Sequence, residues 1–193
     1  MHLQLEDLMT VQRNVLQQAN VTPRNVWEIG VGPPEFCHST SFIQQGIPVM
    51  LFEPTSVYYR ALVDTFGHLF HVNIVNAALS DHDGEALLRM AGLGSWVEGC
   101  VSSADLSRRN NGLSLDGFPV ETVSCWKISH FDHGQIDVCL IDTEGSEWKI
   151  LSQMVSRPRV MRLEVGIGDG ASQYLTPNLE SIMGWIKENQ YSV

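Results

Sequence analysis

The chain has 193 residues, of which 44% are apolar and 18% are charged, and its formal net charge is −10. This composition is typical of one folded globular domain and excludes a disordered chain. The acidic balance argues against a nucleic-acid partner, because affinity for phosphates comes mainly from Lys and Arg. The sequence shows neither a membrane-spanning apolar stretch nor a signal-peptide pattern, so we expect no membrane insertion.

The four cysteines show no metal-binding or redox spacing. They are Cys37, Cys100, Cys125 and Cys139, and no two of them form a CxxC pair. We therefore predict reduced thiols in a cytoplasmic protein, and neither a zinc site nor a disulfide framework.

Hydrophobic periodicity predicts alternating helices and strands in the first half of the chain. A helix is expected over 3–19, within an N-terminal segment 1–20, followed by strands at 25–31, 48–53 and 71–77, with helices at 35–45 and 56–66 between them. Such units form parallel sheets with right-handed crossovers. The prediction is a single Rossmann-like α/β domain over residues 1–193, doubly wound around a mostly parallel sheet.

Residues 84–124 interrupt this rhythm. We expect a short strand at 85–90, a long segment at 92–118, an extended stretch at 119–125 and a short helix at 126–132. The segment 92–118 is interpreted either as a solvated surface loop or as a lid over a substrate, contacted by Trp96, Arg108 and Arg109.

The rhythm then resumes toward the C-terminus. A strand at 136–142 leads into a helix after Glu147, and a strand at 159–165 and a helix at 178–188 follow. Residues 191–193 resemble the start of one more strand, so the C-terminal strands are expected to be shortened or missing.

A glycine turn follows the first predicted strand. Gly30 and Gly32 come directly after an apolar run that contains Glu28, and glycines there let the backbone turn tightly and a ligand approach closely. Roughly 20 residues further on, Glu53 ends the second strand, where it can accept hydrogen bonds from both hydroxyls of a ribose. The two signals together predict a nucleoside cofactor.

The residue at position 35 bears on which nucleoside cofactor is bound. A dinucleotide site needs a small residue there so that a helix N-terminus can approach the pyrophosphate, whereas this chain has Glu35. A carboxylate at this position would repel a pyrophosphate, whereas Glu28 and its acidic surroundings suit the cationic sulfonium and ammonium of S-adenosylmethionine. We therefore favour S-adenosylmethionine over NAD.

Three predicted strands end in a carboxylate, namely Glu53, Asp142 and Glu164. In a parallel sheet these positions share one edge, and charges rarely end buried runs without a partner. Asp142 also shares its turn with Glu144 and Glu147. Such carboxylates act as a general base, hold an amine or hydroxyl, or bind a divalent ion, while a structural ion pair is the alternative for Glu164.

Four motifs in this order resemble the FkbM-type methyltransferases between residues 25 and 165. They are Glu28-Ile29-Gly30-Val31-Gly32, Leu51-Phe52-Glu53-Pro54, Asn76-Ala77-Ala78-Leu79-Ser80-Asp81 with Gly84, and Ile141-Asp142-Thr143-Glu144-Gly145-Ser146-Glu147. The last motif is the most specific. The resemblance implies a seven-stranded class I methyltransferase sheet and methyl transfer from S-adenosylmethionine, with S-adenosylhomocysteine as product.

The resemblance also implies roles for individual residues. It places Glu28, Gly30 and Gly32 at the methionine end, Glu53 with Pro54 at the ribose, Ala78 and Leu79 at the adenine, and Asp142 at the cofactor or acceptor. Pro34 and Cys37 occupy motif positions where the family usually has Gly and Ser or Thr, and we count both as cofactor-binding candidates.

We predict a methyltransferase that acts on a hydroxyl of a small molecule or glycan. The base is expected to be Asp142 or Glu144, with His38, His82, His130 and His133 as lesser candidates, and no metal is predicted. An exposed sheet edge makes a homodimer a further expectation. The alternatives are an NAD-linked oxidoreductase and a module that binds S-adenosylmethionine without catalysis.

Overall fold

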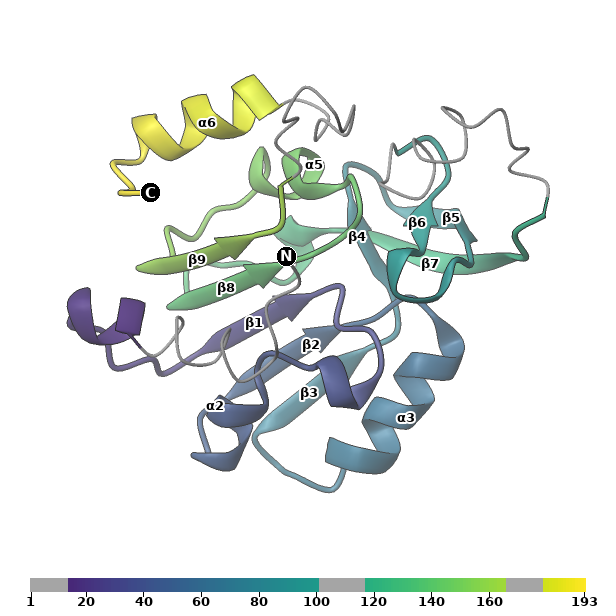
Figure 1. Ribbon diagram of the computed structural model, residues 1–193, viewed down its shortest axis with the longest axis horizontal. Helices are drawn as coiled ribbons and strands as arrows, with labels where there is room; N and C mark the ends of the chain where they lie inside the picture. Colours follow the sequence, from purple (N-terminus) through teal and green to yellow (C-terminus); the bar gives the residue numbers. More distant parts are fainter. Residues whose placement is uncertain (1–13, 101–116, 166–178) are drawn as a thin grey trace.

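The computed structural model describes residues 14–100, 117–165 and 179–193 (Figure 1). Its centre is a sheet of five parallel strands in the order β3-β2-β1-β8-β9. The strands are β1 (Val26–Ile29), β2 (Val49–Phe52), β3 (Val72–Val75), β8 (Val138–Ile141) and β9 (Val160–Leu163). This order confirms the predicted Rossmann-like α/β fold.

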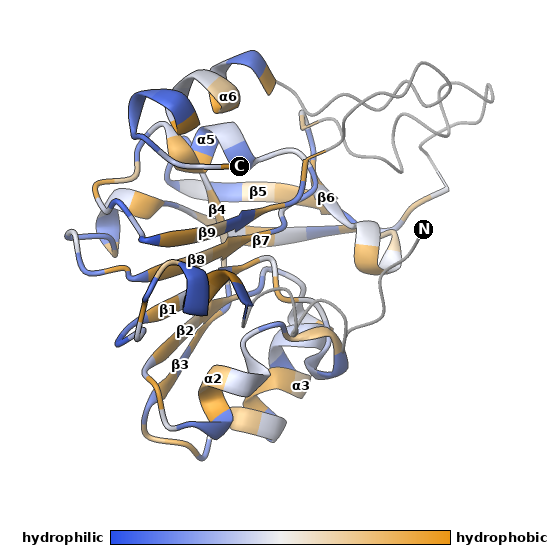
Figure 2. Ribbon diagram, turned by 60° about the vertical axis from the view of Figure 1, so that its left-hand side comes forward, coloured by the Kyte–Doolittle hydropathy of each residue, from blue (hydrophilic) through white to orange (hydrophobic). Residues whose placement is uncertain are grey.

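Helices cover both faces of this sheet, as Figure 1 shows. On one face lie α2 (Thr40–Gln44) and α3 (Ser56–Phe66), and on the other lie α5 (Glu147–Leu151) and α6 (Leu179–Glu188). The strands are therefore apolar on both faces, which explains their continuous hydrophobic runs (Figure 2). In β1, Val26 belongs to the core beneath α2 and α3, whereas Trp27 and Ile29 belong to the core beneath α5 and α6.

A second, smaller sheet interrupts the alternation, with the strand order β4-β7-β5-β6. Its strands are β4 (Ala78–Ser80), β5 (Gly84–Arg89), β6 (Trp96–Val97) and β7 (Val120–Lys127). Only the β4–β7 pair in it is parallel. Adjacent residues of β4 point to different cores: Ala78 packs in the core of the small sheet, and Leu79 packs against the main sheet. The small sheet is thereby fixed to the main one.

The strand expected at 71–77 is confirmed as β3, and β4 begins after it, in the small sheet. One sequence prediction in this region is wrong. The helix expected at 126–132 is replaced by the end of β7 and a 3-10 turn, η3 (Ile128–His130), because pairing with β4 extends β7 to Lys127.

The helix expected at 35–45 is also wrong. The chain forms a 3-10 turn, η1 (Pro34–Phe36), and α2 begins only at Thr40. The reason is the buried Glu28, whose carboxylate accepts hydrogen bonds from the backbone N–H groups of His38 (2.9 Å) and Ser39 (2.8 Å). These two N–H groups are turned inward, so the segment between η1 and α2 is irregular.

The chain ends agree only in part with expectation. Residues 14–18 are helical, and the rest of the predicted N-terminal helix lies outside the described residues. Residues 191–193 form no strand, so within the described ranges β9 is the last strand. All four cysteines are buried and free, as predicted. In the part of the chain described here, no helix has the length and apolarity needed to span a membrane.

Candidate functional site

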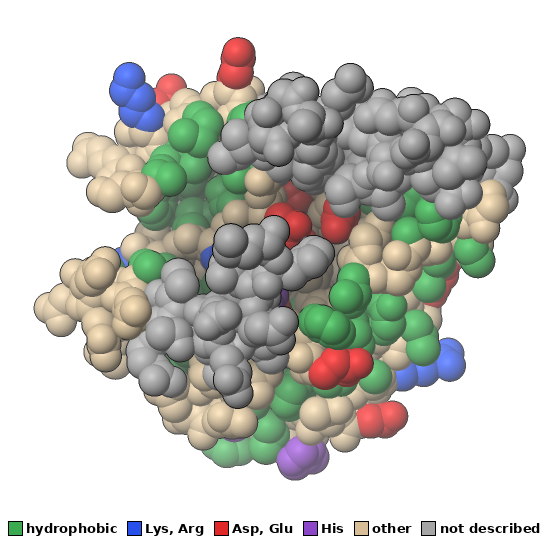
Figure 3. All heavy atoms as spheres, viewed as in Figure 1, with side chains coloured by type: hydrophobic (Ala, Val, Ile, Leu, Met, Phe, Trp, Pro, Cys, Tyr) green, Lys and Arg blue, Asp and Glu red, His purple; other side chains and the backbone are tan. Residues whose placement is uncertain are grey.

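A cavity open to solvent lies where the carboxyl ends of β1, β2 and β8 meet the small sheet. Ligand sites of α/β sheets occupy this edge. Figure 3 shows acidic side chains in a hollow near the centre of this face, with apolar side chains beside them. The lining residues come mainly from four places: the β1 turn (Gly30, Gly32), the β2 end with the start of α3 (Glu53, Pro54, Thr55, Tyr58), the small sheet with its flanks (Ala78, Leu79, Leu88, Leu93, Val97) and the β8 end (Asp142, Thr143, Glu144).

The glycine turn permits two strand ends to touch. Gly30 has φ +81°, and a Cβ placed on it would lie 1.8 Å from the carbonyl oxygen of Asp142. Any other residue would force the ends of β1 and β8 apart. Gly32, with φ +70°, turns its N–H toward Glu53 and donates to its Oε2 atom at 2.7 Å.

Glu53 is buried, with 3% of its surface exposed, and its carboxylate is held by backbone donors. Oε2 accepts from the Gly32 N–H and Oε1 accepts from the Thr55 N–H at 2.7 Å. Burial raises the pKa of Glu53, and these hydrogen bonds oppose the rise. The Thr55 side chain and the Val31 backbone also donate to this carboxylate and lower its pKa, so four protein donors surround it.

Three predicted cofactor contacts lie outside the cavity lining: Glu28, Pro34 and Cys37. Side chains alternate along a strand, so Glu28 points to the same face as Val26, toward α2. There its carboxylate accepts from the N–H groups of His38 and Ser39 and from the thiol of Cys37 at 3.4 Å. Glu28 and Cys37 therefore stabilise the segment that follows the β1 turn and do not face the cavity.

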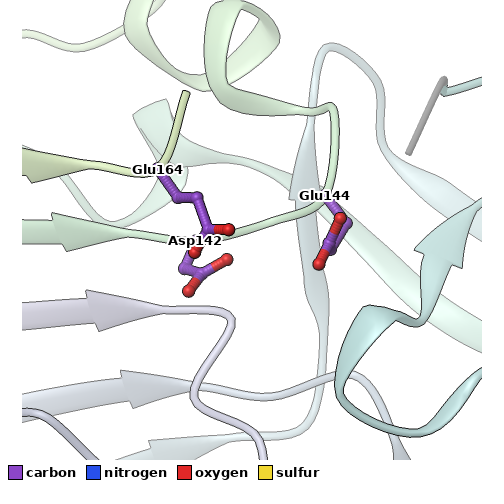
Figure 4. Close-up of side chains that lie close together, drawn as sticks. All are labelled: Asp142, Glu144 and Glu164. Carbon is purple, nitrogen blue, oxygen red and sulfur yellow. The ribbon is translucent and has the colours of Figure 1, made fainter. Parts of the chain in front are cut away.

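The structure brings three carboxyl groups together at the ends of β8 and β9. Asp142, Glu144 and Glu164 each offer an oxygen within 4.8 Å of the others. Figure 4 shows Glu164 reaching from the end of β9 toward Asp142, with Glu144 further along the loop after β8. Of the three, Asp142 and Glu144 line the cavity.

Burial makes Asp142 an unusual acid. Its pKa is raised from 3.8 to about 9, first by burial, then by a hydrogen bond with Glu164 and by the charges of Glu164 and Glu144. Two carboxyl groups this close hold one proton between them at neutral pH. Carboxylate oxygens are also ligands that divalent cations prefer, but a cation here would have to displace that proton.

The candidate histidines do not line the cavity. His82 and His130 are exposed and pair with Asp81 and Asp83, and His133 is exposed as well. Of the four histidines, His38 has the strongly shifted pKa that is typical of active-site groups: burial and the charge of Arg162 lower its pKa to about 4. It is therefore a neutral imidazole at physiological pH, close to Glu164.

Of the three residues expected to contact a substrate from a lid, Trp96 lies within the described residues. Trp96 is 2% exposed and its ring meets Phe118 edge-on at 5.3 Å, so it belongs to the packing of the small sheet. Arg108 and Arg109 lie outside the described residues. The same segment does supply cavity walls that the sequence analysis missed, among them Leu93 and Val97. Nothing in their local pattern separates them from ordinary apolar residues, because their position depends on sheet pairing.

The fold and the cavity define a Rossmann-like α/β protein with the sheet order and site position of the class I methyltransferases. The family model described as the methyltransferase FkbM domain matches residues 29–193. The chain therefore belongs to the FkbM methyltransferase family, as its motifs suggested, and membership supports methyl transfer as its activity. No curated protein matches the chain.

Proposed function

We propose that the chain is an S-adenosylmethionine-dependent methyltransferase that methylates a hydroxyl of a small molecule or glycan. The observation that carries this proposal is the convergence of three features on one cavity. The glycine turn, the ribose-type carboxylate of Glu53 and the acidic pair at the end of β8 all line it. They come from the ends of neighbouring parallel strands, where class I enzymes bind their cofactor.

The residues fit the chemistry of this cofactor. Glu53 lies on the cavity wall at the end of β2, where a carboxylate can accept hydrogen bonds from the hydroxyls of a ribose. Ala78 and Leu79 offer an apolar surface for the adenine. Gly30, Gly32 and the acidic groups after β8 surround the end where the cationic methionine part would lie.

S-adenosylmethionine, when bound, supplies a methyl group already activated by a sulfonium. The chain then has to hold the acceptor oxygen in line with it and exclude water, and positioning of this kind lowers barriers substantially. Leu88, Leu93 and Val97 form an apolar wall that helps to exclude water. Proton removal from the acceptor falls to Asp142 or Glu144, which line the same cavity. Because Asp142 keeps its proton at neutral pH, this role predicts turnover that increases with pH.

The structure gives the NAD alternative less support. A dinucleotide pyrophosphate binds at the N-terminus of a helix that begins directly after the glycines. Here only the three-residue turn η1 follows, and α2 begins at Thr40, eight positions after Gly32. Glu35 itself is exposed in η1, so the helix geometry is the stronger argument against a dinucleotide.

The test is calorimetric titration of the protein with S-adenosylmethionine, S-adenosylhomocysteine and NAD. We expect the first two to bind and NAD not to bind. Glu53→Gln, which keeps the shape of the side chain, should weaken binding by about tenfold or more, because hydrogen bonds to a charged group are replaced by neutral ones.

The matched control is Glu35→Gln, which changes an exposed carboxylate outside the cavity lining. It should leave the affinity unchanged. Preferential binding of NAD would contradict the proposal. Binding of S-adenosylmethionine without formation of S-adenosylhomocysteine across an acceptor screen would favour the non-catalytic module.

The remaining expectations stay predictions. The acceptor class, a homodimer and the absence of a nucleic-acid partner depend on contacts with other molecules. The cytoplasmic location is supported by four buried free thiols.

A further inference from the structure

The loop between β8 and α5 has an unusual backbone. Glu144 has φ +54° and Gly145 has φ +111°, so two consecutive residues adopt positive φ angles. Glycine does so freely, whereas a residue with a side chain does so only when its surroundings hold it there. Thr143 and Glu144 line the cavity, so this strained turn forms part of the site wall.

The carboxylate of Glu147 holds the Thr143–Gly145 turn in this conformation through hydrogen bonds. Its Oε1 atom accepts from the N–H of Thr143 at 3.2 Å, from the hydroxyl of Thr143 at 3.0 Å and from the N–H of Gly145 at 3.1 Å. These donors flank Glu144 on both sides. A charged acceptor makes each of these bonds stronger than a neutral one would be.

This arrangement lowers the stability of the folded protein. Glu147 is 1% exposed, and its Oε2 atom is buried without a hydrogen-bond partner among the described residues. A buried carboxylate with one unpaired oxygen costs free energy, and such exceptions to hydrogen-bond pairing call for a specific cause. Among the described residues, the hydrogen bonds of the Glu147 side chain all lead to the Thr143–Gly145 turn, and the residue itself does not line the cavity.

We propose that Glu147 is a positioning residue, whose buried carboxylate holds the Thr143–Gly145 turn so that Glu144 and Asp142 face the cavity. What those two residues then contact rests on the proposed function. The effect of Glu147 on the turn does not rest on the proposed function, because its hydrogen bonds form within the protein without any ligand. Glu147 acts through the turn and touches no reacting group.

Two variants separate a positioning role from a merely structural one. Glu147→Gln retains an oxygen acceptor toward the turn but removes the charge, and it relieves the burial of a charged group. Glu147→Ala removes the acceptor altogether. The control is Glu188→Gln, an exposed change in α6.

The first measurement uses NMR to determine the rate of hydrogen exchange at the backbone amides of Thr143 and Gly145, in the absence of any ligand. Exchange at these two amides should increase by about threefold to tenfold in Glu147→Gln and by more than about tenfold in Glu147→Ala. The increase is larger in Glu147→Ala because Gln weakens the hydrogen bonds to the turn, whereas Ala removes them. Amides of β1 and β8 should exchange at the wild-type rate in Glu147→Gln. Its melting temperature should equal or exceed that of the wild type, because the desolvation of a charge is removed.

The second measurement is the affinity for S-adenosylhomocysteine. It should be lower in Glu147→Gln than in the wild type and lowest in Glu147→Ala, in parallel with the increase in amide exchange. Wild-type exchange at Thr143 and Gly145 in both variants would overturn the proposal. So would a uniform increase across β1 and β8 in Glu147→Gln, since that would show a general structural role. Failure of the wild type to bind S-adenosylhomocysteine would instead count against the proposed function, while the exchange result would still decide the role of Glu147.

Discussion

Asp142 shows how position converts an ordinary side chain into an unusual acid. It directly follows β8, where burial and the neighbouring carboxyl groups of Glu164 and Glu144 disfavour its charged form. Its pKa of about 9 means that the folded protein binds this proton far more tightly than the unfolded chain does. The stabilising contribution of this proton is therefore complete below about pH 4 and is lost as the pH increases toward 9.

The variant Asp142→Asn tests this pH dependence, because the amide is neutral at every pH. We expect its melting temperature to exceed that of the wild type by about 3 °C or more at pH 8, and the difference to shrink toward pH 4. Thermal melts between pH 4 and pH 9 provide the measurement. The control Asp64→Asn, on the exposed side of α3, should show no such trend. A difference that does not vary with pH would contradict the shifted pKa.

The ends of β1 and β8 are joined through a contact that only glycine allows. The site of a Cβ on Gly30 lies 1.8 Å from the backbone of Asp142, so the two turns that form the cavity floor are in direct contact. Gly46, at the end of α2, has a similar φ of +72°, but nothing lies within 4 Å of its Cβ position. The two glycines share a backbone conformation and differ in their surroundings.

Substitution by alanine separates these two effects. Gly46→Ala should cost only the left-handed conformation, about 1 kcal/mol of the free energy of unfolding. Gly30→Ala adds a clash with backbone atoms and should cost about 3 kcal/mol or more, together with the loss of cofactor affinity. Denaturant titration of both variants measures the comparison. Equal costs would show that the strand ends can separate freely.

The molecule as a whole consists of a main sheet and a small sheet that share one cavity. The main sheet supplies the polar wall, and the small sheet and its flanks supply most of the apolar wall. Besides the shared packing of Leu79, a polar contact joins them: Glu121 of β7 accepts from the hydroxyl of Ser56 and, at 3.3 Å, from its N–H at the start of α3. This contact lies three residues from Glu53.

Removal of this contact should loosen the small sheet relative to the main one. We expect Glu121→Ala to cost about 1–2 kcal/mol and to weaken the affinity for S-adenosylhomocysteine by about threefold or more, because the loop after Glu53 loses its anchor. Hydrogen exchange should increase in β5 and β6 and remain unchanged in β1 and β8. The control Glu85→Ala, exposed on β5, should leave both quantities unchanged. Wild-type affinity in Glu121→Ala would show that packing alone joins the sheets.

Local patterns determined the sheet and the general place of the site. The apolar runs at β1, β2 and β8 are long enough to specify buried parallel strands, and Glu53, Asp142 and Glu164 each follow a strand end as expected. Positions at strand ends share an edge of any parallel sheet, so the shared edge was predictable, and the carboxyl groups of Asp142 and Glu164 lie within 4.8 Å of each other there. The motif after β8 likewise identified the family, which the match over 29–193 confirms.

Tertiary structure decided the roles of individual side chains. Glu28 stands in the glycine motif, yet strand alternation turns it toward α2, where its carboxylate delays the helix expected after Glu35. Leu93 and Val97 reach the cavity only because the small sheet folds against the main one. Periodicity reports which residues are buried, whereas the partner of a buried group depends on the distant segment packed against it. The sequence by itself therefore determined the fold class, the family and the sheet edge at which the cavity lies. The contacts of Glu28 with His38 and Ser39, and of Asp142 with Glu164, required the packed molecule, because they join segments that the chain brings together only on folding.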